Sequence, residues 1–128
     1  MKNKSLKDFK ELINKKPLHI ATVSSDNKPN LSVASDVVVI DDHKLLISAN
    51  EMVNTQKNIQ GNPSVVITSF NKDWEGVRLI GKAEYFTSGE HFDFAKNTFF
   101  GNGEVSPFGA TEPKGVIIFT VEELQEVK

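Results

Sequence analysis

Alternation of apolar and polar side chains is the dominant pattern along this chain, and it predicts a mainly β fold. The clearest example is the segment Val77–Thr87. Its apolar residues occupy one face of an extended strand and its charged residues the other: Val77, Leu79, Ala83 and Tyr85 against Arg78, Lys82 and Glu84. Such alternation is typical of a sheet with one face in the core and one in solvent. Similar patterns predict strands over five more ranges: His19–Ser25, Leu31–Ile40, Lys44–Ala49, Ser64–Phe70 and Val116–Val121.

The strand predicted over Leu31–Ile40 has two distinguishable faces. A period of two residues places Leu31, Val33, Val37 and Val39 on one face, and Ser32, Ala34, Asp36, Val38 and Ile40 on the other. Residues rich in turn formers separate the strands, at Asp26–Asn30, Asp41–His43 and Asn71–Gly76. Phe99–Gly115 has no periodicity and is predicted to be a long loop, and the final EELQEVK a charged tail with a last helical turn.

Three helices are expected at the margins of these strands. Residues 5–15 place four apolar side chains on one helical face: Leu6, Phe9, Leu12 and Ile13. Ser5 with Asp8, and later Thr87 with Glu90, have the spacing of a capping box. A short helix over Thr55–Gln60, capped by Asn54 or Thr55, is predicted to stop at Gly61 and Pro63.

The start of this short helix allows two interpretations. Backbone N–H groups at a helix start lack partners and carry partial positive charge, so the place suits a phosphate or another anion. Alternatively, it is only a capped helix between two strands.

Six strands joined mostly by short turns favour a closed antiparallel barrel over a parallel α/β fold.

Composition narrows the classes of function. A chain of 128 residues is expected to form a single domain, residues 1–128. The formal net charge of −2 argues against a nucleic-acid partner, and the absence of cysteine excludes disulfides and thiolate sites. No apolar run is long enough to span a membrane, and no signal peptide is recognisable, so a cytoplasmic location is expected.

Hydrolytic and metal chemistry find little support in the sequence. There is no G-x-S-x-G motif, and the three histidines, His19, His43 and His91, are far apart without H-x-x-x-H spacing. We therefore expect no metal site. No residue has the pattern of an obligatory catalytic acid, base or nucleophile, so no catalytic residue is assigned.

Two sequence blocks together resemble a known family. They are KLLISANEMVNTQKNIQGNP at residues 44–63 and GVRLIGKAE at residues 76–84. In this combination the chain is similar to the pyridoxamine 5′-phosphate oxidase-like split barrels that bind flavin mononucleotide (FMN), over about Phe9–Phe94. The resemblance implies a six-stranded antiparallel split β-barrel, mainly β with peripheral helices, that forms a homodimer with FMN at the subunit interface.

The resemblance also implies the residues that would contact FMN. The phosphate positions of the family, at the start of the helix after the third strand, correspond to Asn54, Thr55 and Asn58. The contacts to the flavin ring correspond to residues at the ends of two strands: Ser32, Val33, Ala34 and Ser35 on one, and Ser48, Ala49 and Asn50 on the other.

The phosphate positions depart from the pattern of the oxidases. Those enzymes have Arg and Lys where this chain has Asn54 and Thr55. Replacing two charge-assisted hydrogen bonds by neutral ones weakens binding by roughly ten- to a hundredfold, unless Lys57, Lys28 or a second subunit compensates. No cation stands between Leu31 and Ile40 either, so a true pyridoxine phosphate oxidase is not expected.

The leading hypothesis is therefore an FMN-binding flavoprotein, an oxidoreductase or electron carrier whose cofactor provides the chemistry. The small-molecule electron donor and acceptor cannot be named from the sequence. Two alternatives stay open: the same fold with a deazaflavin or haem, or a dimeric binding module without activity. Trp74, the one tryptophan, either covers the mouth of the barrel or forms a lid near the flavin of the partner subunit.

Overall fold

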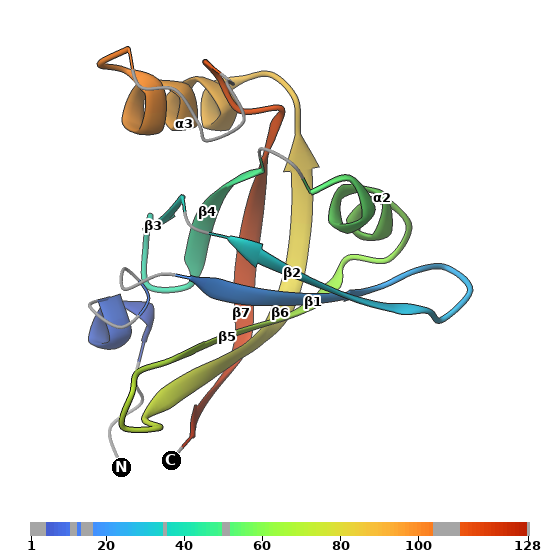
Figure 1. Cartoon of the computed structure of the whole chain (residues 1–128), viewed down its shortest axis with the longest axis vertical. Helices are drawn as coiled ribbons and strands as arrows, with labels where there is room; N and C mark the ends of the chain where they lie inside the picture. The colour runs from blue at the N-terminus through green and yellow to red at the C-terminus, as the bar shows by residue number, and fades with distance from the viewer. Residues whose placement is uncertain are drawn as a thin grey trace.

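The computed structural model describes residues 5–10, 13, 17–34, 36–49, 52–103 and 111–127, in which one seven-stranded antiparallel sheet curls around a hydrophobic interior (Figure 1). The strands are β1 (Leu18–Val23), β2 (Pro29–Ala34), β3 (Val37–Val39), β4 (Lys44–Ala49), β5 (Ser64–Phe70), β6 (Gly76–Phe86) and β7 (Gly115–Val127). Their order across the sheet is β2-β1-β5-β6-β7-β4-β3. The predicted mainly β class and antiparallel pairing are confirmed.

The prediction of six strands is wrong, because the segment predicted as one strand over Leu31–Ile40 forms two. Strand β2 pairs with β1, with Ala34 opposite Leu18, whereas β3 pairs with β4, with Val37 opposite Ile47. These two strands are the opposite edges of the sheet. The sheet curls so far that β2 also contacts β4, which gives a half-barrel.

The break between β2 and β3 also changes which side chains face the interior. Val37 is buried, whereas Leu31 and Val33 are 66% and 54% exposed. The predicted common face for these three residues is therefore wrong. Alternation continues only along an uninterrupted strand, and the chain crosses here from one edge of the sheet to the other.

Two hydrophobic clusters hold the sheet. The interior cluster joins residues from β1, β4, β5, β6 and β7, and Phe119 of β7 is its largest fully buried side chain. A second cluster lies on the other side of β4 and β7, where helix α3 (Glu90–Phe100) covers Leu46, Val116 and Ile118 with Ala95. Figure 1 shows α3 across the upper ends of these strands.

Of the two predicted capping boxes, the structure has the first and lacks the second. In the 3-10 helix η1 (Leu6–Phe9), the Asp8 carboxylate accepts the Ser5 N–H at 2.8 Å, as the predicted capping box requires. Helix α3 has Gly89, not Thr87, as its N-cap, so the second predicted capping box is wrong. Gly89 has φ 97°, a conformation that glycine adopts without steric cost. Leu12 and the remainder of the predicted first helix, except Ile13, lie outside the described residues.

The chain's last residues form a strand, not the predicted helical turn. Strand β7 continues to Val127 and pairs with β6 along its length, while its first half also pairs with β4. A bulge interrupts this ladder: Ile80 is opposite Glu123 and Gly81 opposite Val121, which leaves Glu122 as the extra residue. Gly81 is required here, because a Cβ would lie 2.0 Å from the Thr120 carbonyl oxygen.

Tyr85 of β6 occupies the space that a side chain on Gly115 would fill. A Cβ on Gly115 would lie 2.1 Å from the Tyr85 hydroxyl oxygen. Gly115 pairs with Ala49 at the end of β4, so the phenol lies near that strand end. Burial raises the pKa of Tyr85 above its usual value of 10.0.

Removing the Phe119 side chain should cost about 3–5 kcal/mol of unfolding free energy, because it leaves a cavity in the interior cluster. Urea denaturation of the Phe119→Ala variant measures this. Phe94→Ala is the matched control: the same substitution at a residue that is 45% exposed should change the free energy by less than about 0.5 kcal/mol. Equal losses in the two variants would contradict the assignment of the core.

The raised pKa of Tyr85 predicts a loss of stability in alkali. Below about pH 10 the phenol is protonated in both the folded and the unfolded chain and contributes no pH dependence. As the pH rises above that value, the unfolded chain loses this proton more readily, so the free energy of unfolding falls. Urea denaturation on both sides of about pH 10 should show this fall, smaller in Tyr85→Phe. Identical profiles for the two proteins would refute it.

Candidate functional site

Helix α2 (Val53–Gly61) begins where the resemblance places the phosphate anchor. Its N-cap is Met52, and no side-chain hydrogen bond caps it, so the predicted cap by Asn54 or Thr55 is wrong. The helix is also longer at both ends than predicted. The backbone N–H of Gln56 donates to the Met52 carbonyl at 2.9 Å, which starts the helical ladder. Ile59 anchors the helix in the interior cluster.

The first turn of α2 has the properties of an anion site. The N–H groups of Val53, Asn54 and Thr55 precede the ladder and so have no acceptor within the helix. The first turn contains no acidic residue that would neutralise the partial positive charge of this end. A phosphate could therefore bind to backbone N–H groups here without a cationic side chain.

Thr55 points away from solvent, into a small polar cluster with β2. Its side chain is fully buried, and its hydroxyl hydrogen-bonds to the Ser32 hydroxyl. The Asn30 amide donates to the same Thr55 oxygen at 3.2 Å and to Ser32 at 3.4 Å. These contacts bring β2 and α2 together as the resemblance implies, but they occupy the Thr55 hydroxyl within the protein.

Asn58 has a similar role one turn further along α2. Its side chain is 8% exposed, and its amide nitrogen donates to the Thr22 hydroxyl of β1 at 3.0 Å. Buried polar groups are costly unless they are hydrogen-bonded, so both contacts fix the helix on the β1–β2 hairpin. Of the three residues predicted at the phosphate, only Asn54 is exposed.

The end of β4 forms the second part of the candidate site. Ser48 and Ala49 are 3% and 2% exposed, and Ser48 donates its backbone N–H to the Asp36 carbonyl at 2.9 Å. Ala49 belongs to the interior cluster beside Gly115. The predicted contact Asn50 follows directly but lies outside the described residues.

Strand β2 provides the third part. Ser32 is half-buried against Thr55, Val33 is 54% exposed, and Ala34 is buried. Their alternation means that Val33 faces away from the other two, so a single flat ligand on one side of β2 would not contact all three side chains. Ser35 lies outside the described residues.

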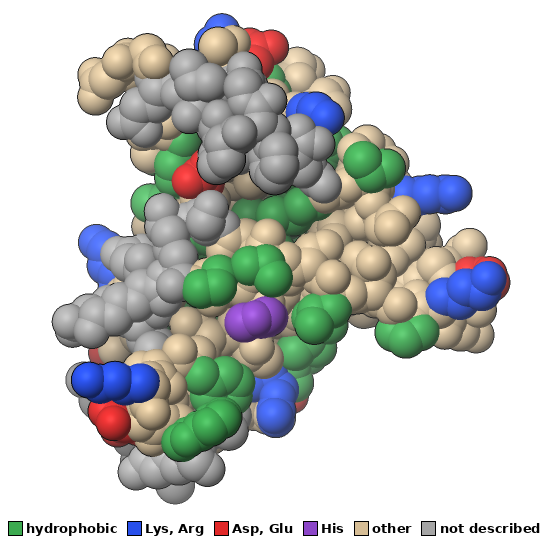
Figure 2. Space-filling model, viewed as in Figure 1, with side chains coloured by type: hydrophobic (Ala, Val, Ile, Leu, Met, Phe, Trp, Pro, Cys, Tyr) green, Lys and Arg blue, Asp and Glu red, His purple; other side chains and the backbone are tan. Residues whose placement is uncertain are grey.

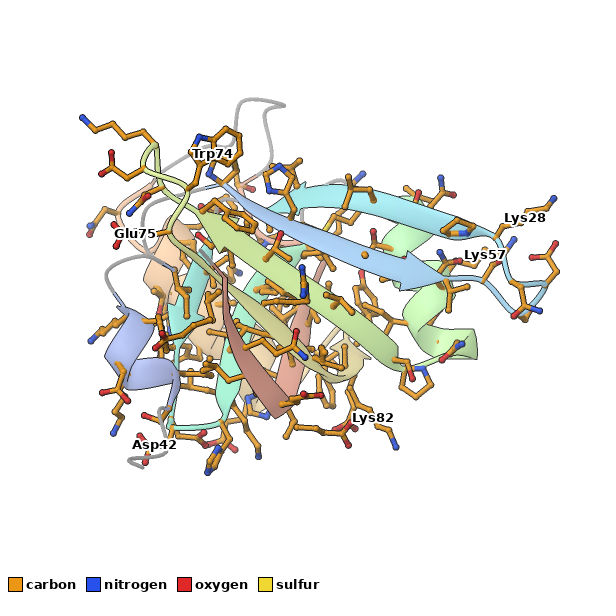
Figure 3. All side chains as sticks on the ribbon, turned by 90° about the horizontal axis from the view of Figure 1, so that it is seen from below. Lys28, Asp42, Lys57, Trp74, Glu75 and Lys82 are labelled. Atoms are coloured by element: carbon orange, nitrogen blue, oxygen red, sulfur yellow. The ribbon has the colours of Figure 1, made fainter. Side chains whose placement is uncertain are left out.

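Two lysines lie at the same end of the molecule as α2. Figure 3 shows Lys57 of α2 near Lys28 of the β1–β2 turn, and Trp74 at the opposite end. Asp26 partly neutralises this charge, because its carboxylate lies 3.7 Å from the Lys28 amine. The Ser24 hydroxyl, assisted by Lys28 and Lys57, lowers the pKa of Asp26. Trp74 therefore does not cover the candidate site of its own chain.

The partners of the buried polar residues were not apparent from the sequence. Asn30 was assigned to a turn, although β2 begins at Pro29 and places Asn30, Ser32 and Ala34 on one face. Extending the alternation of β2 by two residues would have revealed Asn30. No sequence signal identified Thr22, because a threonine in a strand is ordinary.

The described residues show neither a metal cluster nor a membrane span. No three acidic or histidine side chains among them are grouped so that they could hold a metal ion. None of their helices has the length and apolar character needed to cross a bilayer.

Thr55→Val should destabilise the protein by about 1–3 kcal/mol, because it preserves shape but leaves Asn30 and Ser32 without their shared partner. Thr87→Val makes the same change at an exposed residue and should cost less than about 0.5 kcal/mol. Urea denaturation compares the two. A Thr55→Val variant as stable as the parent would show that these hydrogen bonds contribute little to the attachment of α2 to β2.

Comparison with known proteins agrees with this geometry. A family model described as pyridoxamine 5′-phosphate oxidase matches residues 5–128. The uncharacterized protein MJ0282 of Methanocaldococcus jannaschii is 32% identical over 111 residues, which cover 85% of this chain and 71% of that protein.

Solved structures share the fold over nearly the whole chain. HupZ of Group A Streptococcus has a TM-score of 0.82 and 27% identity, over 98% of this chain and 94% of that one. An FMN-binding protein from Syntrophomonas wolfei has a TM-score of 0.81 and 19% identity, over 96% and 86%. An F420 reductase and the heme storage protein HutZ of Vibrio cholerae also have this fold, at 17% and 15% identity. The chain thus belongs to the pyridoxamine 5′-phosphate oxidase-like split-barrel family.

Proposed function

We propose that this protein binds FMN, with the phosphate at the start of α2 and the flavin ring near β2 and the end of β4. The observation that carries the proposal is the uncapped first turn of α2, which has no acidic residue. The backbone N–H groups of Val53, Asn54 and Thr55 would bind the phosphate oxygens, and the exposed Asn54 amide adds a side-chain donor.

This arrangement would bind phosphate more weakly than the Arg and Lys of the oxidases. A neutral hydrogen bond contributes about 0.5–1.5 kcal/mol, whereas one to a charged group contributes about 1.5–3 kcal/mol. Because Thr55 and Asn58 are already hydrogen-bonded to Ser32 and Thr22, backbone groups provide most of the donors. The proposed activity is therefore that of a flavoprotein other than pyridoxine phosphate oxidase.

Electron or hydride transfer is the chemistry that a flavin supplies when bound. The chain's own residues would bind and orient the ring, in keeping with an oxidoreductase or electron carrier. In this proposal Ser32 and Ala49 are the contacts to the ring edge. The Tyr85 hydroxyl lies against Gly115, which pairs with Ala49 at the same strand end. Like any tyrosine phenol, that of Tyr85 is protonated at neutral pH, and burial raises its pKa further.

A second copy of the chain would complete the site. The half-barrel leaves the outer side of β1 and β2 open, and Val33, whose side chain faces away from those of Ser32 and Ala34, is exposed there. A ligand of FMN size is normally enclosed on most of its surface, which one half-barrel does not provide. A homodimer with the cofactor between the subunits would provide the missing wall.

One observation favours a second candidate, the same site with a different ring. No side chain in the first turn of α2 is cationic. A ligand whose affinity depends less on a phosphate group would therefore bind with little loss of affinity. Relatives of this fold include an F420 reductase and a heme storage protein, so a deazaflavin or haem is the alternative ligand. The third alternative is a binding module of this fold that holds no cofactor.

Titration with FMN, riboflavin, F420 and haemin, followed by absorbance and by quenching of ligand fluorescence, separates these candidates. FMN bound more tightly than riboflavin supports the proposed phosphate site, because the two ligands differ only in that group. A preference for F420 or haemin would identify that compound, and not FMN, as the ligand. Failure to bind any of the four ligands would support the remaining alternative, a binding module that carries no flavin.

Asn54 is the position at which the phosphate site can be tested without disturbing the core. Asn54→Arg restores a cation where the oxidases have one and should strengthen FMN binding by about tenfold, since it adds about 1.4 kcal/mol. Asn54→Asp should weaken it by a similar factor. Riboflavin affinity should change little in both variants.

The matched control is Gln60→Arg, which adds the same charge to an exposed residue at the other end of α2. It should leave FMN affinity within about twofold. Thr55 is unsuitable for this test, because any substitution there disrupts buried hydrogen bonds. Equal effects of Asn54→Arg and Gln60→Arg would show that the phosphate does not bind at the helix start.

A further inference from the structure

We propose that Tyr85 recognises the ring of the bound ligand, because its hydroxyl can donate a hydrogen bond to a carbonyl oxygen or nitrogen at the polar edge of that ring. The inference rests on the proposed function and deepens it by naming the ligand class: a flavin or a deazaflavin, and not a haem. Three features carry it: the place of Tyr85 at the rim of the interior, the small residues beside it, and the access of its hydroxyl to solvent.

Tyr85 is the last inward-facing residue of β6. The inward residues before it on this strand, from Val77 to Ala83, are buried, whereas Tyr85 is only half-buried. Its ring packs against the edge of the interior cluster. A phenol has an apolar body and a polar tip, so it suits a position where one end lies in the core and the other reaches water.

Three strands end at this rim and bring Tyr85 to the candidate site. Strand β6 ends at Phe86, β4 ends at Ala49, and β7 begins at Gly115 and pairs with both. Met52, the N-cap of α2, packs against the same cluster as Tyr85. Figure 1 shows α2 beside the upper part of β6. The rim therefore lies next to the helix start at which the phosphate is proposed to bind.

The inward residues of β4 and β7 become small at the rim. Further into the interior their inward side chains are large and buried: Leu45, Ile47, Ile117 and Phe119. At the rim itself the paired residues are Ala49 and Gly115. The space above these two residues is therefore not filled by their own side chains, and the phenol of Tyr85 extends over part of it.

The contact with Gly115 shows the direction of the phenol. Tyr85 pairs with Ile117, so Gly115 is its diagonal neighbour on β7, within reach of an aromatic side chain. A Cβ on Gly115 would collide with the Tyr85 hydroxyl oxygen and with the ring carbon that bears it. The phenol thus leans from β6 across β7, and its hydroxyl lies on the side of β4, where the ring of the ligand is proposed to bind.

The Tyr85 hydroxyl is available to a ligand. No group among the described residues hydrogen-bonds to it, and none of their buried polar side-chain atoms lacks a partner, so this hydroxyl reaches solvent. Figure 2 shows hydrophobic side chains between α3 and the β1–β2 hairpin, at the height where β6 and β7 end in the same view of Figure 1. A tyrosine hydroxyl keeps its proton at neutral pH and can act as a donor.

The chemistry of the rim favours a flat ring with one polar edge. Ala49, Gly115 and Met52 offer apolar surface, and Tyr85 adds a hydroxyl donor. The ring of a flavin has carbonyl oxygens and nitrogens along one edge, and a deazaflavin keeps those carbonyl groups. A ring that cannot accept this hydrogen bond would displace water from the hydroxyl without replacing it, which costs affinity.

Tyr85 is the one tyrosine of the chain, so a fluorotyrosine label reports on this position alone. The labelled full chain is titrated with FMN, riboflavin and inorganic phosphate, and fluorine NMR follows the label. We expect both flavins to shift the resonance, because they share the ring. Inorganic phosphate should leave it unchanged, because it can occupy only the start of α2.

Tyr85→Phe removes the hydroxyl and preserves the ring. It should weaken the binding of FMN and riboflavin by the same factor, about threefold to tenfold, which distinguishes a contact to the ring from a contact to the phosphate. The infrared carbonyl bands of bound FMN should also move in this variant. Thr87→Val removes a hydroxyl from an exposed residue just beyond β6 and should leave the bands unchanged and both affinities within about twofold.

Two results would overturn this inference while the proposed function stands. They are FMN binding that leaves the fluorine resonance unmoved, and a folded Tyr85→Phe variant that binds both flavins as tightly as the parent with the same carbonyl bands. Thermal unfolding confirms that the variant is folded. A preference for F420 with the same response of Tyr85 would uphold the inference and replace FMN as the ligand. A parent protein that binds neither a flavin nor a deazaflavin would refute the proposed function and this inference together.

Discussion

The buried hydrogen bonds between helix α2 and the β1–β2 hairpin are the constraint on which the candidate site depends. Thr55 is joined to Ser32 and Asn30, and Asn58 to Thr22, so the helix is fixed on both strands. Each contact lies out of water, where an unpaired partner would be costly. The direction of the helix start, and with it the direction of its free N–H groups, follows from these few polar side chains.

The residues at the family's phosphate positions have other roles in this protein than the resemblance implies. The resemblance implies Arg and Lys in the oxidases at the positions of Asn54 and Thr55, whereas here Thr55 faces strand β2 and only Asn54 faces solvent. In the proposed site, anion recognition would therefore depend on backbone N–H groups more than on side chains. Backbone donors fix position well but discriminate little by charge. Such a site would select its ligand mainly by the shape of the ring.

Much of the fold could be predicted from the sequence, because alternation marks a half-buried strand wherever the strand is regular. Val77–Thr87 and Ser64–Phe70 were placed nearly to the residue. The prediction of one strand over Leu31–Ile40 was wrong, because a single sequence does not show with which neighbouring strand each residue pairs. For the site, the motif located α2 correctly. The inward rotation of Thr55 was not predictable, since it depends on Asn30 and Ser32 from a distant strand.

The position of β7 has a consequence for how the protein acquires its structure in the cell. Among the described strands, the hairpin β3–β4 pairs with the rest of the sheet only through β7, which lies between β4 and β6 although it follows both in the sequence. A nascent chain that has already emerged as far as β6 therefore exposes two unjoined pieces of sheet, each with an open edge. These edges are covered only when β7 pairs with both, so we expect closure of the half-barrel to be a late step in folding and the unpaired edges to be prone to aggregation until then.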